Sequence, residues 1–127
     1  MPTYRAPVED MLYVLNDVLN VESYSNLPGF EDSSPDIIKA VLEEGAKMAE
    51  EVLQPLNQSG DAEGCTWHED GSVTTPAGFK EAYKQYTENG WQGLTAPVEY
   101  GGQGLPYIMG AALEEMCVSA NHAFKMY

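Results

Sequence analysis

Residues 90–106 read GWQGLTAPVEYGGQGLP and are the most distinctive part of the sequence. Their glycines and prolines predict a tight, irregular connection rather than a helix or a strand. A glycine-rich loop can bind phosphate, but a P-loop also needs a lysine and a preceding strand, and this stretch has neither. We interpret it as a turn before a helix. The alternative is weak anion binding at the exposed amides of that helix start.

A helix is expected on each side of this loop. Before the loop, Thr75-Pro76 is a typical helix start, and Asn89-Gly90 supplies the glycine that often follows a last turn. The buried stripe of this helix is predicted to be Phe79, Ala82, Tyr83 and Tyr86. After the loop, Pro106 begins a last helix whose apolar period continues to Tyr127 without a cap. A pattern that stops in this way predicts a chain cut within a helix.

Two more helices are predicted nearer the N-terminus. Residues 7–19 carry a broad apolar stripe at helical spacing. Ser33-Ser34-Pro35-Asp36 is a strong start for the second helix, because serine caps and proline suits the first turn. Pro55 is expected to kink or end this second helix, and Gly60 to close it.

The loop between residues 61 and 75 contains one hairpin signal. Asp70-Gly71 is a favoured tight turn, and the flanking residues allow at most a short ribbon. The expected fold class is therefore all-α, with a short hairpin or loop near 65–74.

The charge of the chain excludes several classes of partner. Six basic residues face twenty acidic ones among 127, for a formal net charge of −14. Such a surface repels nucleic acid and anionic membranes. No apolar run approaches the roughly 18 residues of a membrane span, and the first residues do not resemble a signal peptide. We therefore expect a cytoplasmic protein whose two cysteines, Cys65 and Cys117, are free thiols.

Few side chains in the sequence suggest catalysis or metal binding. His68 lies beside Glu69 and Asp70, but successive loop residues rarely converge on one ion, so no metal site is expected. The adjacent acids Glu114 and Glu115 point in different directions on a helix, which argues against an acid–base pair. No serine has the setting of a nucleophile, so a small independent hydrolase is unsupported.

The sequence of residues 90–106 resembles the segment of acyl-CoA dehydrogenases that reads G-W-x-G-L-x-x-P-x-E-Y-G-G-x-G-L. The following Leu113-Glu114-Glu115-Met116 resembles the helix after that segment. Residues 4–11 and 120–127 resemble the corresponding parts of a large bacterial subgroup, which includes enzymes of the methylmercaptopropionyl-CoA type. The similarity thus covers nearly the whole chain, and the loop is its most specific part.

This resemblance implies a fold and an activity. Residues 31–127 would be the N-terminal helical domain of the acyl-CoA dehydrogenase fold, and residues 1–30 an extension helix with a linker. In the family, a glutamate removes the α-proton of an acyl-CoA thioester while the N5 atom of non-covalent FAD accepts the β-hydride. The glutamate and most FAD contacts lie downstream of this domain, so no catalytic and no cofactor-binding residue is expected in this chain, which would be inactive alone.

The resemblance also implies partners and one site. The partners would be the acyl-CoA substrate, the remaining domains, further copies in a homo-oligomer, and an electron-transfer flavoprotein as acceptor. The end of the last helix lines the acyl-chain pocket in the family. The corresponding residues here are Ala123, Phe124, Met126 and Tyr127. Ordinary core packing is the alternative for these four, and Lys125 departs from the small residue expected at its position.

A second hypothesis is a free-standing helical module that binds a protein partner. In that case the similarity would reflect descent alone, because a fold does not fix a function.

Overall fold

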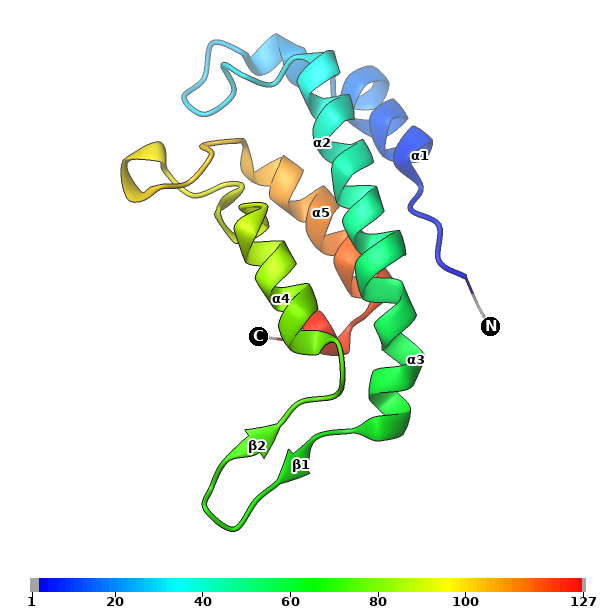
Figure 1. Cartoon of the computed structure of the whole chain (residues 1–127). Coiled ribbons are helices and arrows are strands. Elements are labelled where there is room, and N and C mark those ends of the chain that lie inside the picture. Colours follow the sequence, from blue (N-terminus) through cyan, green and yellow to red (C-terminus); the bar gives the residue numbers. More distant parts are fainter. Residues whose placement is uncertain (1–2, 127) are drawn as a thin grey trace.

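The computed structural model describes residues 3–126 and shows a helical bundle with a small projecting ribbon (Figure 1). The chain begins with α1, Val8–Leu12, which continues as a π-helical turn, η1, Tyr13–Val18. Asn20 then adopts a left-handed conformation with φ of 48°, which asparagine tolerates better than most residues, and a 3-10 turn, η2, Val21–Tyr24, follows. The predicted first helix over residues 7–19 is thus confirmed to within a residue at each end.

The longest element is a continuous helix made of α2, Pro35–Lys47, a π-helical segment, η3, Met48–Leu53, and α3, Gln54–Glu63. As predicted, Ser34 caps its start, and its side chain accepts a hydrogen bond from the Ile37 amide. Pro55 neither ends nor interrupts this run. The π-helical turn just before it changes the hydrogen-bond register at the position where proline cannot donate.

The helix also continues past Gly60, where the sequence predicted its end. Gly60 is buried, and a Cβ atom at this position would lie 2.5 Å from Cε2 of Phe79. This glycine therefore provides room for an aromatic ring from another helix. The helix stops at Gly64, whose φ is 67°.

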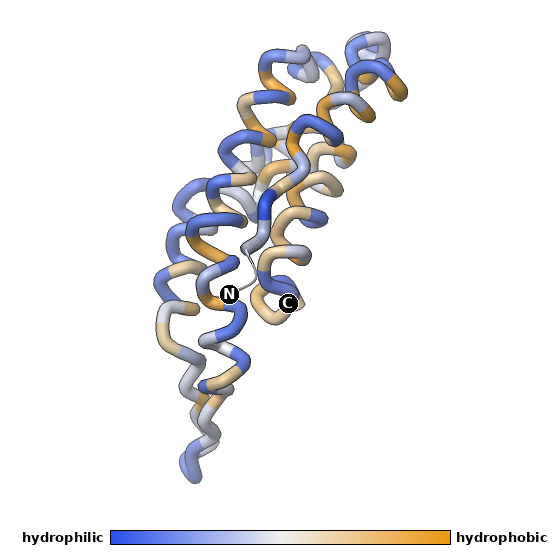
Figure 2. The backbone as a smooth tube through the Cα atoms, turned by 90° about the vertical axis from the view of Figure 1, so that its right-hand side faces the viewer, coloured by the Kyte–Doolittle hydropathy of each residue, from blue (hydrophilic) through white to orange (hydrophobic). Residues whose placement is uncertain are grey.

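The expected hairpin is present and short. Strands β1, Thr66–Trp67, and β2, Val73–Thr74, pair in antiparallel register, with Thr66 opposite Thr74. The ribbon extends beyond the ends of the helices, and its tip is hydrophilic (Figure 2).

Helix α4, Phe79–Glu88, begins three residues later than Thr75-Pro76 suggested, with Gly78 preceding its first turn. Its end agrees with the prediction, because Gly90 has φ of 75° and its amide donates to the carbonyl of Thr87. Of the predicted buried stripe, Ala82 and Tyr86 are buried and Phe79 is partly buried, but Tyr83 is exposed.

The glycine-rich loop contains two 3-10 turns, η4, Trp91–Gly93, and η5, Val98–Tyr100. It leads into α5, Tyr107–Ala120, and a final 3-10 turn, η6, Ala123–Lys125. The last helix therefore ends at Ala120 and does not continue to the end of the chain, which corrects the prediction. Tyr127 lies outside the described residues.

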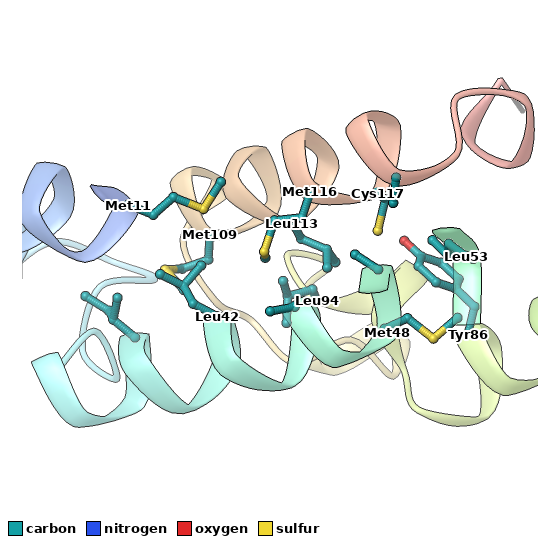
Figure 3. Close-up of a cluster of buried hydrophobic side chains, with 14 of the residues drawn as sticks. Met11, Leu42, Met48, Leu53, Tyr86, Leu94, Met109, Leu113, Met116 and Cys117 are labelled. Atoms are coloured by element: carbon teal, nitrogen blue, oxygen red, sulfur yellow. The ribbon is translucent and has the colours of Figure 1, made fainter. Parts of the chain in front are cut away.

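The core lies where α2 and η3 face α5 and α4, with α1 packed on the same cluster (Figure 3). Leu42, Leu53, Met116 and Cys117 are completely or almost completely buried. The all-α architecture with a small hairpin is thus confirmed. It brings the C-terminal turn beside the first turn of α4 (Figure 1).

Candidate functional site

Asn121 turns the chain at the end of α5. This side chain is 1% exposed, and its Nδ2 donates to the carbonyl of Leu53 at 3.1 Å. Its Oδ1 accepts from the amide of Phe124 at 3.1 Å. One buried amide group therefore satisfies a carbonyl of the long helix and caps the next turn. It fixes both the end of α5 and the direction of residues 122–126.

Residues 122–126, which we call the terminal turn, border an open hollow of about 1020 Å³. The walls come from α3, the base of the hairpin, the first turns of α4, and the turn itself. Residues from these four parts include Gly60, Cys65, Phe79, Tyr83, Phe124 and Met126. Of the four residues predicted for an apolar pocket, Ala123, Phe124 and Met126 line this hollow together, while Tyr127 is not described.

Aromatic contacts hold Phe124 at the edge of the hollow. Its ring meets Tyr86 edge-to-face, with centroids 5.7 Å apart, and Phe79 at 6.4 Å. Such offset arrangements suit the charge distribution of aromatic rings. Phe124 is therefore partly buried against the core and also lines the hollow, so it serves packing and lining together.

Lys125, which departs from the expected small residue, makes the main polar contacts of the turn. Its Nζ lies 2.6 Å from Oε1 of Glu114 and 3.1 Å from the hydroxyl of Tyr86. Burial alone would lower the pKa of Lys125, but the hydrogen bonds to Glu114 and Tyr86 outweigh this effect and the pKa is raised. At neutral pH the Lys125 ammonium is therefore charged and paired with the Glu114 carboxylate.

Two neighbouring groups show what burial does here. Burial raises the pKa of the Tyr86 phenol, against the effect of the nearby Lys125. Burial also raises the pKa of the Cys117 thiol to about 11. Tyr86 and Cys117 face each other at one end of the core (Figure 3). Both groups are neutral at neutral pH, so neither is poised as a nucleophile or base.

The sequence did not reveal the polar partners of this turn. The pairing of Glu114 with Lys125 depends on the chain turning at Asn121. No helical spacing relates two residues separated by a break in the helix. The contact between Gly60 and Phe79 was hidden for a similar reason, since glycine was interpreted as a helix end.

The glycine-rich loop does not offer a phosphate cradle. The amides of Gly101, Gly102, Gln103, Gly104 and Leu105 all donate to backbone carbonyls of the same loop, at 2.9 to 3.1 Å. At Gly102 an added Cβ would lie 2.1 Å from the carbonyl oxygen of Ala96. These five amides are therefore not free to bind a phosphate group. Weak anion binding at the amide groups of the helix start, the alternative drawn from the sequence, stays a prediction.

Two of the three hairpin residues considered for a metal form hydrogen bonds to other residues of the hairpin. His68 Nε2 lies 2.7 Å from Thr74 Oγ1, and Asp70 accepts from Ser72. Within residues 3–126, no group of three or more histidine, cysteine or acidic side chains is arranged to hold a metal ion. In the same range, no helix has the length and hydrophobicity needed to cross a membrane.

Comparison with known proteins gives one family and two relatives. The model of the family described as acyl-CoA dehydrogenase, N-terminal domain, matches residues 38–127. The chain is 38% identical over 122 residues to 3-methylmercaptopropionyl-CoA dehydrogenase of Ruegeria pomeroyi, covering 96% of this chain and 21% of that protein. It is 29% identical over 128 aligned positions to the broad-specificity linear acyl-CoA dehydrogenase FadE5 of Mycobacterium tuberculosis, covering 100% of this chain and 21% of the relative. The chain thus spans about a fifth of the length of the curated relatives it matches.

Proposed function

The chain belongs to the acyl-CoA dehydrogenase family, and we propose that it acts as the N-terminal helical domain of an enzyme that α,β-dehydrogenates acyl-CoA thioesters. In this role its terminal turn forms part of the wall of the acyl-chain pocket, and its helices pack against the remaining domains. The chain alone is inactive on this proposal.

The observation that carries the proposal is the hollow at the terminal turn. Ala123, Phe124 and Met126 line it from one side and Phe79 from another. An acyl chain needs an apolar wall with few polar groups. Each methylene buried against such a wall contributes about 0.8 kcal/mol to binding, so the depth of the hollow would influence which chain lengths bind.

The flavin of such an enzyme would be held elsewhere. When bound, FAD supplies the acceptor for the β-hydride. In support of this, the amides of residues 101–105 in the loop between α4 and α5 donate to carbonyls of the same loop and are not free to bind the phosphates of FAD. The contribution of this chain would be to exclude water from the thioester's acyl end and to position that end.

Several further features belong to the same proposal. Residues 1–30 would be an extension that packs on the domain of residues 31–127, and α1 contacts α2 in this way. The complete enzyme would be a cytoplasmic homo-oligomer that passes electrons to an electron-transfer flavoprotein.

The test is the visible spectrum of the product of the gene's complete reading frame, recorded beside that of residues 1–127 alone. We expect flavin bands in the longer product only, bleached anaerobically by an acyl-CoA thioester. A reading frame that stops after Tyr127, or a longer product that is colourless or not bleached by any thioester, would contradict the proposal. Those results would favour the free-standing interaction module.

A further inference from the structure

The side chain of Lys125 faces a different hollow from those of Phe124 and Met126, its neighbours on the terminal turn. Phe124 and Met126 line the larger hollow. Lys125 lines a second hollow of about 600 Å³, on the side of Tyr107 and Glu114. The side chain of Lys125 is 12% exposed, unlike the 74% exposed Lys84 of α4. Consecutive residues of η6 therefore divide between two hollows.

Two side chains clamp the Lys125 ammonium. Glu114 from α5 lies 2.6 Å from Nζ, and the Tyr86 hydroxyl from α4 lies 3.1 Å from it. Nζ is also 4.9 Å from the centroid of the Tyr86 ring, within the range of a cation–π contact. A mostly buried ammonium that lost these partners would be costly, so the lysine is held in one orientation.

The same tyrosine connects this clamp to the lining of the larger hollow. Tyr86 meets the ring of Phe124 edge-to-face, and Phe124 follows directly before Lys125 in the chain. Asn121 fixes the other end of the turn through the Phe124 amide. The turn is thus held at both ends, and a rotation that moved Lys125 out of the clamp would also move Phe124 and Met126.

We propose that Lys125 is a positioning residue for the acyl-chain wall, because its clamp between Glu114 and Tyr86 keeps Phe124 and Met126 directed at the larger hollow. This inference rests on the function proposed above. Lys125 itself stays away from the acyl chain and acts only through its neighbours.

The test compares Lys125→Met, Lys125→Arg and Glu114→Gln with the matched control Lys84→Met, which removes a lysine paired with Glu88 on the exposed face of α4. Two readouts are taken. In residues 1–127, NMR follows the contacts between the Phe124 and Tyr86 rings and the titration of the Tyr86 phenol. In the complete enzyme, kcat and KM are measured for thioesters of short and long acyl chains.

We expect Lys125→Met to lose the ring contacts and to raise the pKa of Tyr86, because Lys125 lowers it. In the enzyme, KM for long-chain thioesters should rise by about fivefold to tenfold with kcat retained, which is the signature of lost binding without lost chemistry. Lys125→Arg should preserve both readouts. Glu114→Gln keeps the ammonium, so it should weaken the ring contacts partially and raise KM for long-chain thioesters by less than Lys125→Met does. Lys84→Met should change neither the ring contacts nor KM.

The two proposals fail in different ways. Unchanged ring contacts or unchanged chain-length preference in Lys125→Met, in an enzyme that oxidises thioesters, would overturn the positioning role alone. If Lys125→Met loses the ring contacts but the protein oxidises no thioester, the clamp on Lys125 is supported. The proposed function is then overturned, and with it the acyl-chain wall that the clamp would position.

Discussion

At the scale of single residues, Asn121 shows how one side chain redirects the chain. Its buried amide group bonds to the long helix on one side and to the Phe124 amide on the other. The apolar period of α5 continues past this point, so the period alone predicted a longer helix. A short polar side chain inside an apolar pattern can satisfy backbone groups that a helix would otherwise use, and here it does.

We predict that Asn121→Ala destabilises the fold. The substitution leaves the Leu53 carbonyl and the Phe124 amide without these partners, which costs about 1–3 kcal/mol for buried polar groups. The measurement is the free energy of unfolding in urea. Asn57→Ala, at an exposed position of α3, is the control and should change it by much less. Equal effects of the two substitutions would show that the buried amide does not stabilise the turn.

The two cysteines give a second prediction at this scale. Cys65 is exposed, whereas Cys117 is completely buried and its pKa is raised by burial to about 11. Near pH 8, a thiol reagent should therefore modify Cys65 quickly in the native chain and Cys117 only after denaturant is added. The variant Cys65→Ser should show no fast reaction. Fast modification of both thiols in the native chain would mean that the core around Cys117 opens readily.

At the scale of elements, the sequence predicted a helix start or end correctly where hydrogen bonds and backbone conformation within a few residues determine it. The Ser34-Pro35 start of α2 and the Gly90 end of α4 were predictable, because capping and left-handed glycine act within a few residues. Pro55 and Gly60 were misjudged, because a π-helical turn and a ring from another helix decide their roles. Those are tertiary effects that no local window contains.

The glycine-rich loop allows a sharp comparison between two glycines. A Cβ atom added at Gly102 would lie 2.1 Å from the carbonyl oxygen of Ala96. A Cβ atom added at Gly93 would have its nearest neighbour, the Cα atom of Gly102, at 3.5 Å, which is an ordinary contact distance. We expect Gly102→Ala to destabilise the chain by about 1–3 kcal/mol, and Gly93→Ala to be nearly neutral. Thermal or urea unfolding measures both. Similar stabilities for the two variants would contradict the close packing of this loop.

The segment before α1 is held by Glu50, which predicts a pH dependence. Hydrogen bonds from the Ala6 amide and from Arg5 lower the pKa of Glu50 below its ordinary value of 4.5. A carboxyl group with a lowered folded pKa stabilises the fold above its ordinary pKa, and this contribution is lost as the pH falls through the folded value.

We therefore expect Glu50→Gln to be less stable than wild type at pH 7, with the difference shrinking in the acid range below 4.5. Urea unfolding at several pH values is the measurement. Glu51→Gln, on the exposed neighbouring residue, serves as the control, and it should lower the free energy of unfolding at pH 7 by less than Glu50→Gln does. A constant difference at all pH values would rule out an ionic role for Glu50.

At the scale of the whole molecule, the fold class and the family could be predicted from the sequence, but the shape of the candidate site could not. The sequence of residues 90–106 identified the family, because its glycines occupy positions where the backbone packs closely. The hollow forms where α3, the hairpin, α4 and the terminal turn meet, and these are far apart in sequence. The sequence indicated three of the residues that line this hollow, Ala123, Phe124 and Met126. It did not place Phe79 there or identify the partners of Lys125, because these contacts depend on how the elements pack.

In the proposed function, the terminal turn forms part of the wall around an acyl chain. Met126 is the residue best suited to test it, because it lines the hollow and is 62% exposed in this chain, so enlarging it should cost little stability. The matched control is Val18→Phe, an exposed apolar position on η1 that does not border the hollow.

The decisive measurement is kcat/KM of the complete enzyme for thioesters of increasing acyl length, with Met126→Phe beside wild type and Val18→Phe. We expect Met126→Phe to lower kcat/KM for long-chain thioesters by an amount on the order of tenfold and to leave kcat/KM for short chains unchanged, while Val18→Phe matches wild type throughout. Identical chain-length profiles for all three proteins would contradict a role for the terminal turn in the acyl-chain wall.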